Sequence, residues 1–159
     1  MTATSGEAGG GPSVGVDRAA RAARAAARLA KQVEVALGEM DLSLPQYRVL
    51  ALLSRGSAAA SVLAGNLSVS RPSVTALVDG LIARGLVQRG DDPDDRRKVT
   101  HLLTSKGKRT LRQADAVIAT RLEEIAAEGG DASGCFDGLL AWADALDTWR
   151  DRRVLTAQR

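Results

Sequence analysis

The sequence is poor in the residue types that build metal centres and many enzyme active sites. Its 159 residues include one cysteine and one histidine, which excludes an internal disulfide and leaves almost no ligands for a metal. No glycine-rich phosphate loop, pair of catalytic carboxylates or nucleophile triad is present. The sequence therefore predicts a protein that is not an enzyme and that needs no cofactor or metal.

Aromatic residues are also scarce, at 3% of the chain, so the core must be packed from leucine, valine and alanine. Enrichment in alanine and leucine favours helices, and the length suits one domain. No apolar run approaches the ~18 residues of a membrane-spanning helix. Residues 1–15 have neither the basic nor the apolar part of a secretory signal. We therefore expect a cytoplasmic protein with no membrane partner.

The net charge of +3 is small, but it is unevenly distributed. Residues 70–109 carry nine basic and five acidic side chains, whereas residues 110–149 carry two basic and eight acidic ones. A basic middle beside an acidic segment suggests that one surface meets a polyanion. Ordinary scatter of charges along a helical protein is the alternative.

The first half of the chain predicts a tail and three helices. Residues 1–16 are expected to be disordered, and a helix should run from Asp17 to about residue 37. Its arginines and lysine recur on one side, as either a solvated face or a nucleic-acid contact: Arg18, Arg21, Arg24, Arg28 and Lys31. A second helix should start at Ser43, where the spacing to Gln46 matches a capping box. A short third helix should span residues 60–66.

A stronger helical pattern follows Ser70, which is a good N-cap with Pro72 in the first turn. Val74, Val78 and Leu81 mark its core face. The opposite face carries short side chains, which would let the helix lie deep in a major groove. The candidate DNA contacts on it are Ser70, Arg71, Pro72, Ser73, Thr75 and Ala76. A helix packed on both sides would also need small residues.

Gly85 suits the left-handed position that ends a helix, and two segments of strand character follow at residues 86–89 and 99–103. The polar loop between them contains an Asp-Pro turn and then three consecutive cations. Arginine matches phosphate and a narrow minor groove. The candidate contacts of this hairpin are Arg89, Asp95, Arg96, Arg97 and Lys98.

Two further helices are predicted at residues 105–128, capped by Ser105, and at residues 133–150, with a break at Gly129-Gly130. Both carry apolar stripes. Together with the first helix they have more apolar face than a small DNA-binding core could cover. A two-fold dimer would bury the excess.

The run from Leu81 to Gly107 resembles the wing signature of MarR-type winged helix-turn-helix regulators. Its matching residues are Gly85, Asp95 with Arg97, Leu103-Thr104 and Gly107. The resemblance covers roughly residues 17–150 and implies a mainly α fold with a small β-wing. Within that single domain, residues 43–104 would form the winged helix-turn-helix, residues 17–40 and 105–150 the dimerisation helices, and residues 151–159 a C-terminal tail.

The same resemblance implies a homodimer that binds double-stranded DNA at a palindromic operator. It also implies a repressor released by a small-molecule effector, whose pocket would lie where the dimerisation helices meet the winged region. Tyr47 and Trp142 are candidate contacts of that effector.

Three alternatives remain open at this point. His101, in a predicted strand without a second ligand, is either structural or close to DNA. Cys135 fits a buried small hydrophobe better than a redox sensor, since no cation adjoins it in the sequence. Finally, a winged helix can bind protein instead of DNA. In that case carboxylates of the same chain would form ion pairs with the basic side chains of the wing.

Overall fold

The computed structural model describes residues 13–91 and 99–157. In chain order the described elements are α1 (Ser13–Gly38), α2 (Leu44–Leu53), β1 (Ala58–Ala59), α3 (Ala60–Leu67), α4 (Arg71–Ala83), β2 (Val87–Asp91), β3 (Val99–Leu103), α5 (Ser105–Glu128) and α6 (Ala132–Ala157). This is the predicted mainly α fold with a small β-wing. The predicted tip of the wing, including Asp95, Arg96, Arg97 and Lys98, lies outside the described residues.

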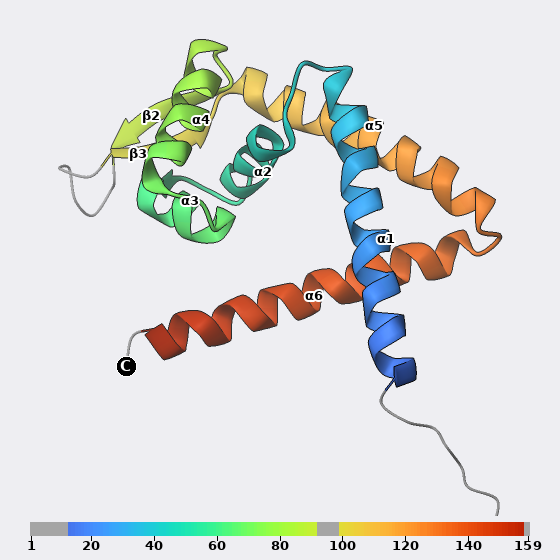
Figure 1. Cartoon of the computed structure of the whole chain (residues 1–159). Helices are drawn as coiled ribbons and strands as arrows, with labels where there is room; N and C mark the ends of the chain where they lie inside the picture. Colours follow the sequence, from blue (N-terminus) through green and yellow to red (C-terminus); the bar gives the residue numbers. More distant parts are fainter. Residues whose placement is uncertain (1–12, 92–98, 158–159) are drawn as a thin grey trace, which may run out of the picture.

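The elements divide into two parts, which Figure 1 shows side by side. Helices α2, α3 and α4 cluster with the strands, and we call residues 44–103 the winged region. Helices α1, α5 and α6 are the flanking helices. Helix α5 leaves the winged region, turns at Gly129-Gly130 and returns as α6, which runs across α1 below the winged region (Figure 1).

The winged region is built on one apolar core to which each of its helices contributes. Helix α2 supplies Val49, Leu50 and Leu53, and α3 supplies Leu63 and Leu67. The core continues into the strands and the flanking helices through Leu86, Val87, Leu103, Leu111 and Ile118. Burial of these aliphatic groups stabilises the fold by about 25 cal/mol per Å² of apolar surface, and it fixes the orientation of α4 against α2 and α3.

A helix-turn-helix joins α3 to α4. Helix α3 ends at Ser68, whose φ of 55° lies in the left-handed region, and three residues later α4 begins. The length of α3 agrees with that of the helix predicted at residues 60–66. The capping box of Ser43 and Gln46, at the start of α2, is formed as predicted.

The three strands form one antiparallel sheet in the order β1-β3-β2. In β3, His101 lies opposite Arg89 of β2 on one side and Ala58 of β1 on the other. The two-residue strand β1 was not predicted, because Ala58-Ala59 carries no periodicity of its own and pairs only through its backbone.

Three predicted boundaries are wrong. Helix α1 begins at Ser13 instead of Asp17, since residues 13–16 contain no proline and propagation from the helix that follows adds a hydrogen bond for each residue. Helix α6 continues to Ala157 through the predicted tail, where no glycine or proline stops it. The N-cap of α5 is Thr104 and not Ser105, because the Thr104 hydroxyl accepts the N–H of Gly107.

Candidate nucleic-acid interface

Helix α4 has a well-formed start. Ser70 has an extended backbone, and its hydroxyl accepts a hydrogen bond from the backbone N–H of Ser73 at 3.3 Å. The hydroxyls of Ser70 and Ser73 also lie 2.7 Å apart. A capped helix start presents backbone N–H groups and the positive end of the helix dipole, a combination that suits a phosphate.

The two sides of α4 differ as the sequence predicts. Val74, Val78 and Leu81 are buried, whereas the side chains proposed to contact DNA are exposed: Arg71, Pro72, Ser73, Thr75 and Ala76. Further along the helix, Gly80 is half-buried, and a Cβ there would lie 3.9 Å from Nε2 of Gln46. The exposed positions are therefore most numerous in the first two turns of the helix, and Asp79 and Ala83 are exposed further along it.

Arg89 lies on β2, beside α4, and its side chain is exposed. Its guanidinium forms an ion pair with Asp79 of α4, with 3.2 Å between Nη2 and Oδ1. The sequence gave no sign of this pairing, because the two residues meet only once α4 and β2 pack together. The ion pair therefore links the exposed helix to the hairpin.

The base of the hairpin explains the Leu-Thr-x-x-Gly part of the wing signature. Gly85 has a φ of 69°, which a residue with a Cβ adopts only at a cost. The Thr104 hydroxyl donates to the carbonyl oxygen of Gly85 at 2.7 Å. Any Cβ on Gly107 would overlap the carbonyl oxygen of Leu86. Glycine at position 107 thus allows the first turn of α5 to lie directly against Leu86, between α4 and β2.

A cavity of about 250 Å³ lies between α4 and the hairpin. Its lining includes Thr75 and Asp79 of α4, Arg89 of β2 and His101 of β3. His101 is only 8% exposed, and its Nδ1 has no hydrogen-bond partner in the described part of the chain. An unsatisfied buried polar atom costs about 1–3 kcal/mol. His101 is thus buried beside α4, and both of its predicted roles, structural or close to DNA, stay predictions.

The two predicted effector contacts lie in different surroundings. Tyr47 of α2 is half-buried, and its hydroxyl donates to Oδ1 of Asp115 on α5 at 2.9 Å. Burial, together with this hydrogen bond and the negative charge of Asp115, raises the pKa of Tyr47 to about 12. Trp142 on α6 is 67% exposed. The described part of the chain does not join them in a common cavity, and Asp115 was not anticipated.

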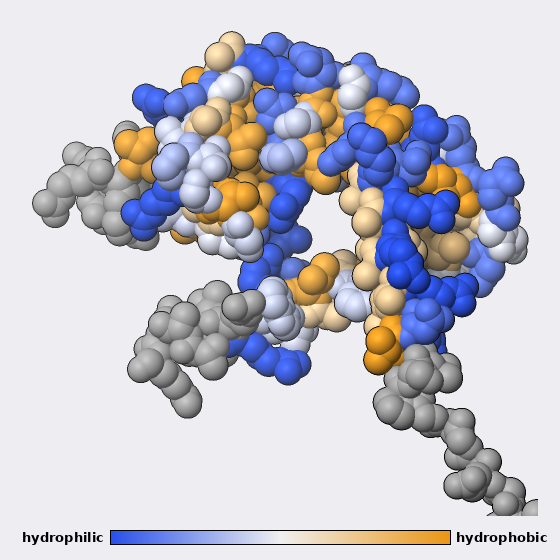
Figure 2. Space-filling model, viewed as in Figure 1, coloured by the Kyte–Doolittle hydropathy of each residue, from blue (hydrophilic) through white to orange (hydrophobic). Residues whose placement is uncertain are grey.

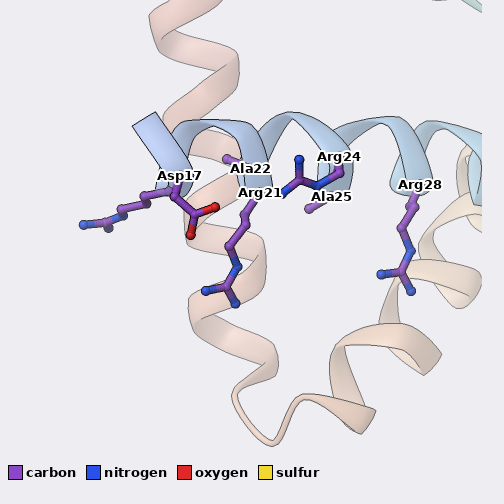
Figure 3. Close-up of a pocket in the computed structure, with 7 residues that line it drawn as sticks. Asp17, Arg21, Ala22, Arg24, Ala25 and Arg28 are labelled. Atoms are coloured by element: carbon purple, nitrogen blue, oxygen red, sulfur yellow. The ribbon is translucent and has the colours of Figure 1, made fainter. Parts of the chain in front are cut away.

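The flanking helices expose both charge and apolar surface. A groove of about 850 Å³ runs along α1 and is lined by Arg18, Arg21, Arg24 and Arg28 together with Asp17 and two alanines. Figure 3 shows Arg21 and Arg28 extending to the same side of the helix. The predicted basic stripe is therefore exposed.

Helix α6 carries several large apolar side chains on its surface: Leu139, Leu140, Trp142, Leu146 and Trp149. Figure 2 shows apolar colour along both α1 and α6. Cys135 on the same helix is exposed and free, so the interpretation of a buried hydrophobe is wrong. The reason is that α6 extends away from the core instead of packing along it.

Two classes of feature are absent from the part of the chain that the structure describes. Residues 13–91 and 99–157 contain no group of three or more histidine, cysteine or acidic residues that could hold a metal ion. No helix within those ranges combines the length and apolarity needed to cross a membrane.

Comparison with known proteins identifies the class of fold. The model of the MarR family matches residues 40–98. The transcriptional repressor CouR, solved with a 23-mer DNA duplex, is 30% identical, with a TM-score of 0.67 over 80% of this chain and 89% of that one. A second structure, CouR from Rhodococcus jostii RHA1 bound to p-coumaroyl-CoA, is 28% identical, with a TM-score of 0.60 over 64% of this chain and 73% of that one.

A curated relative agrees. The uncharacterized HTH-type transcriptional regulator YhbI of Bacillus subtilis (strain 168) is 36% identical over 85 residues, or 53% of this chain. The chain spans 55% of the length of that relative. This chain belongs to the MarR family of winged-helix transcriptional regulators. The membership confirms the resemblance, the fold class and the prediction of a regulator instead of an enzyme.

Proposed function

We propose that this chain is a homodimeric, sequence-specific DNA-binding regulator, acting as a repressor that a small-molecule effector releases. The observation that carries the proposal is the geometry of α4. Its first two turns expose Arg71, Ser73 and Thr75 around a capped start, while Val74 and Val78 anchor the other side in the core.

In this proposal α4 enters the major groove. The hydroxyls of Ser73 and Thr75 and the guanidinium of Arg71 contact base edges or phosphates, and the methyl group of Ala76 can contact thymine. The small side chains of Pro72 and Ala76 keep the helix close to the bases.

The wing supplies the phosphate or minor-groove contacts through Arg89 and the loop residues Arg96, Arg97 and Lys98, while Asp95 pairs with a neighbouring arginine and holds the shape of the loop. Arg89 must leave Asp79 to reach DNA. Both side chains of this pair are more than half exposed, and exposed ion pairs contribute only about 0–1 kcal/mol. Exchange of Asp79 for a phosphate therefore costs little.

The flanking helices support a two-fold dimer. Leu139, Trp142, Leu146 and Trp149 follow a spacing of three, four and three residues, which aligns them as one stripe on α6. A second copy would bury this stripe and would present two α4 helices to successive major grooves of a palindrome.

The effector is proposed to bind where the flanking helices meet the winged region, with Tyr47 and Trp142 as candidate contacts. Because CouR was solved with p-coumaroyl-CoA, an aromatic acyl-CoA is a reasonable first ligand to test. Release of a bound duplex by p-coumaroyl-CoA, with coenzyme A alone as the control, would support this part of the proposal.

The central test is selection of bound duplexes from a random DNA pool with the purified chain. An enriched palindrome is expected, and the absence of any enriched sequence would contradict sequence-specific binding.

Analytical ultracentrifugation tests the dimer with two variants. Trp142→Glu, within the stripe, should yield monomers, whereas Leu140→Glu, which is exposed but lies off the stripe, should not. A monomeric wild type would refute the dimer.

A second candidate is a winged helix that binds protein. The Arg89–Asp79 ion pair favours this candidate, since one basic side chain of the hairpin is already paired with a carboxylate of the same chain. This candidate predicts that the chain has no DNA affinity that depends on salt. A measurable decline of DNA affinity with rising salt would exclude it.

A further inference from the structure

We propose that DNA binding by this chain is coupled to proton uptake at His101, which replaces Arg89 as the partner of Asp79 when Arg89 turns to the DNA. The inference rests on the proposed DNA-binding function. It adds that affinity for DNA increases as the pH falls.

The position of His101 supports this role. It lies in the central strand β3, directly opposite Arg89 of β2, and it lines the 250 Å³ cavity together with Asp79 and Arg89. Among the described residues, the charged groups that line this cavity are Asp79 from α4 and Arg89 from β2. The neighbouring positions from β1 and α3 are Ala58 and Ala60, which carry no charge.

The hydrogen bonding of His101 supports it as well. Its Nδ1 has no hydrogen-bond partner among residues 13–91 and 99–157, although the residue is only 8% exposed. A protonated imidazole donates from both nitrogens and therefore calls for an acceptor. The carboxylate of Asp79 lies in the same cavity but is engaged by Arg89 at 3.2 Å.

DNA binding changes which cation is paired with Asp79. When the guanidinium of Arg89 turns to a phosphate, Asp79 loses its cation and the cavity loses a positive charge. Both changes favour a protonated His101, and the exchange requires the carboxylate of Asp79, which forms no ion pair with His101 while Arg89 holds it, to approach Nδ1–H. The proton comes from solvent, and the imidazolium replaces the guanidinium, so the charge beside Asp79 is conserved. Near neutral pH histidine is the side chain best suited to this exchange.

The direction of the pH dependence follows from linkage. Because the complex favours the protonated ring, the added affinity is present at low pH and is lost as the pH rises through the titration of His101 in the complex. Bound DNA raises the affinity of His101 for a proton by the same factor by which the proton raises the affinity of the chain for DNA.

The chain has a single histidine, so one imidazole signal in an NMR titration reports His101 alone. With a duplex recovered from the random pool, its titration midpoint should rise by about one pH unit, which corresponds to about tenfold tighter binding at pH 5.5 than at pH 8.5. His101→Gln should bind with a much flatter pH profile. An unchanged midpoint on adding DNA, or an equal pH dependence in His101→Gln, would overturn the proposal.

A second experiment needs no DNA, so it separates this inference from the proposed function. In the free protein Arg89→Ala imitates the departure of Arg89 and should raise the His101 midpoint. The double variant Arg89→Ala/Asp79→Asn should cancel that rise, whereas Arg89→Ala/Asp41→Asn, which removes an exposed acid at the turn after α1, should keep it. A rise that persists without Asp79, or no rise at all, would refute the exchange. A protein that binds no DNA but passes this test would refute only the proposed function.

Discussion

The Tyr47 hydroxyl donates a 2.9 Å hydrogen bond to Oδ1 of Asp115, across 68 positions of the chain. It joins α2 of the winged region to α5 of the flanking helices. Because Tyr47 is the one tyrosine of the chain, this contact can be followed without interference from other phenols.

Removing the hydroxyl with Tyr47→Phe keeps the ring in its place against the core and deletes only the hydrogen bond. We expect a loss of about 1 kcal/mol in the free energy of unfolding, measured by urea denaturation. Asp115→Asn keeps an acceptor oxygen at this position and should lose less. Equal midpoints for Tyr47→Phe and the wild type would show that the bond contributes nothing to stability.

Tyr47 also predicts a specific response to alkali. Since burial raises the pKa of the phenol to about 12 from about 10 in an unfolded chain, its contribution to stability is complete below pH 10 and is lost between pH 10 and 12. Tyrosinate absorbance should therefore titrate near 12 in the folded protein and near 10 in urea. Asp115→Asn should lower the folded value only in part, because burial is the largest cause. A folded midpoint near 10 would contradict the buried environment.

Gly107→Ala should be strongly destabilising. The added Cβ overlaps the carbonyl oxygen of Leu86, and this is backbone that cannot move aside as a flexible side chain would. We expect a cost of about 3 kcal/mol in the free energy of unfolding. Gly65→Ala is the matched control, since it lies within α3 with nothing inside 4 Å, and it should stabilise by about 0.5–1 kcal/mol. Similar effects at the two positions would refute the close approach.

Arg71→Ala separates base readout from general attraction. If Arg71 contacts a base edge, the variant should lose about 1–3 kcal/mol of specific binding and much less of non-specific binding. Fluorescence anisotropy with the selected duplex and a scrambled duplex measures both. Equal losses on the two duplexes would indicate a phosphate contact instead.

The wing arginines should act mainly through charge. Arg97→Ala should weaken specific and non-specific binding alike and lower the slope of log affinity against log salt by about one. Arg89→Ala should lower the slope less, because in the wild type Arg89 leaves Asp79 unpaired when it contacts a phosphate, which already offsets part of its contribution to the slope. An unchanged slope in Arg97→Ala would remove this residue from the interface.

The sequence predicted those elements whose signal is local. Val74, Val78 and Leu81 repeat at helical spacing, and Ser43, Ser70 and Gly85 end or begin helices by rules that need only their neighbours. The family signature then identified the hairpin. Thr104 was missed as a cap because Ser105, the next residue, is an equally good capping type, and the choice depends on the hydrogen bond to Gly85 across the hairpin.

Contacts between distant elements could not be predicted. Neither the Tyr47–Asp115 bond nor the Arg89–Asp79 pair follows from spacing, since each needs two elements to be placed by the core. The exposure of Cys135 was mispredicted for a related reason. A helix with apolar residues suggests burial, but the surface that would cover α6 does not belong to the same protomer in our proposal.

Helix α5 begins against the base of the hairpin, where Gly107 touches Leu86, and continues for 24 residues to the turn before α6. At 1.5 Å per residue it is about 36 Å long. One rigid rod thus connects the hairpin to the helices proposed to meet a second copy. In a dimer, the distance between the two wings would be set by the angle between two such rods. A few degrees of tilt at the far end would move the wings apart by several ångströms. In such a dimer, the stiffness and the tilt of α5 would therefore determine which spacings of operator half-sites the two wings can reach.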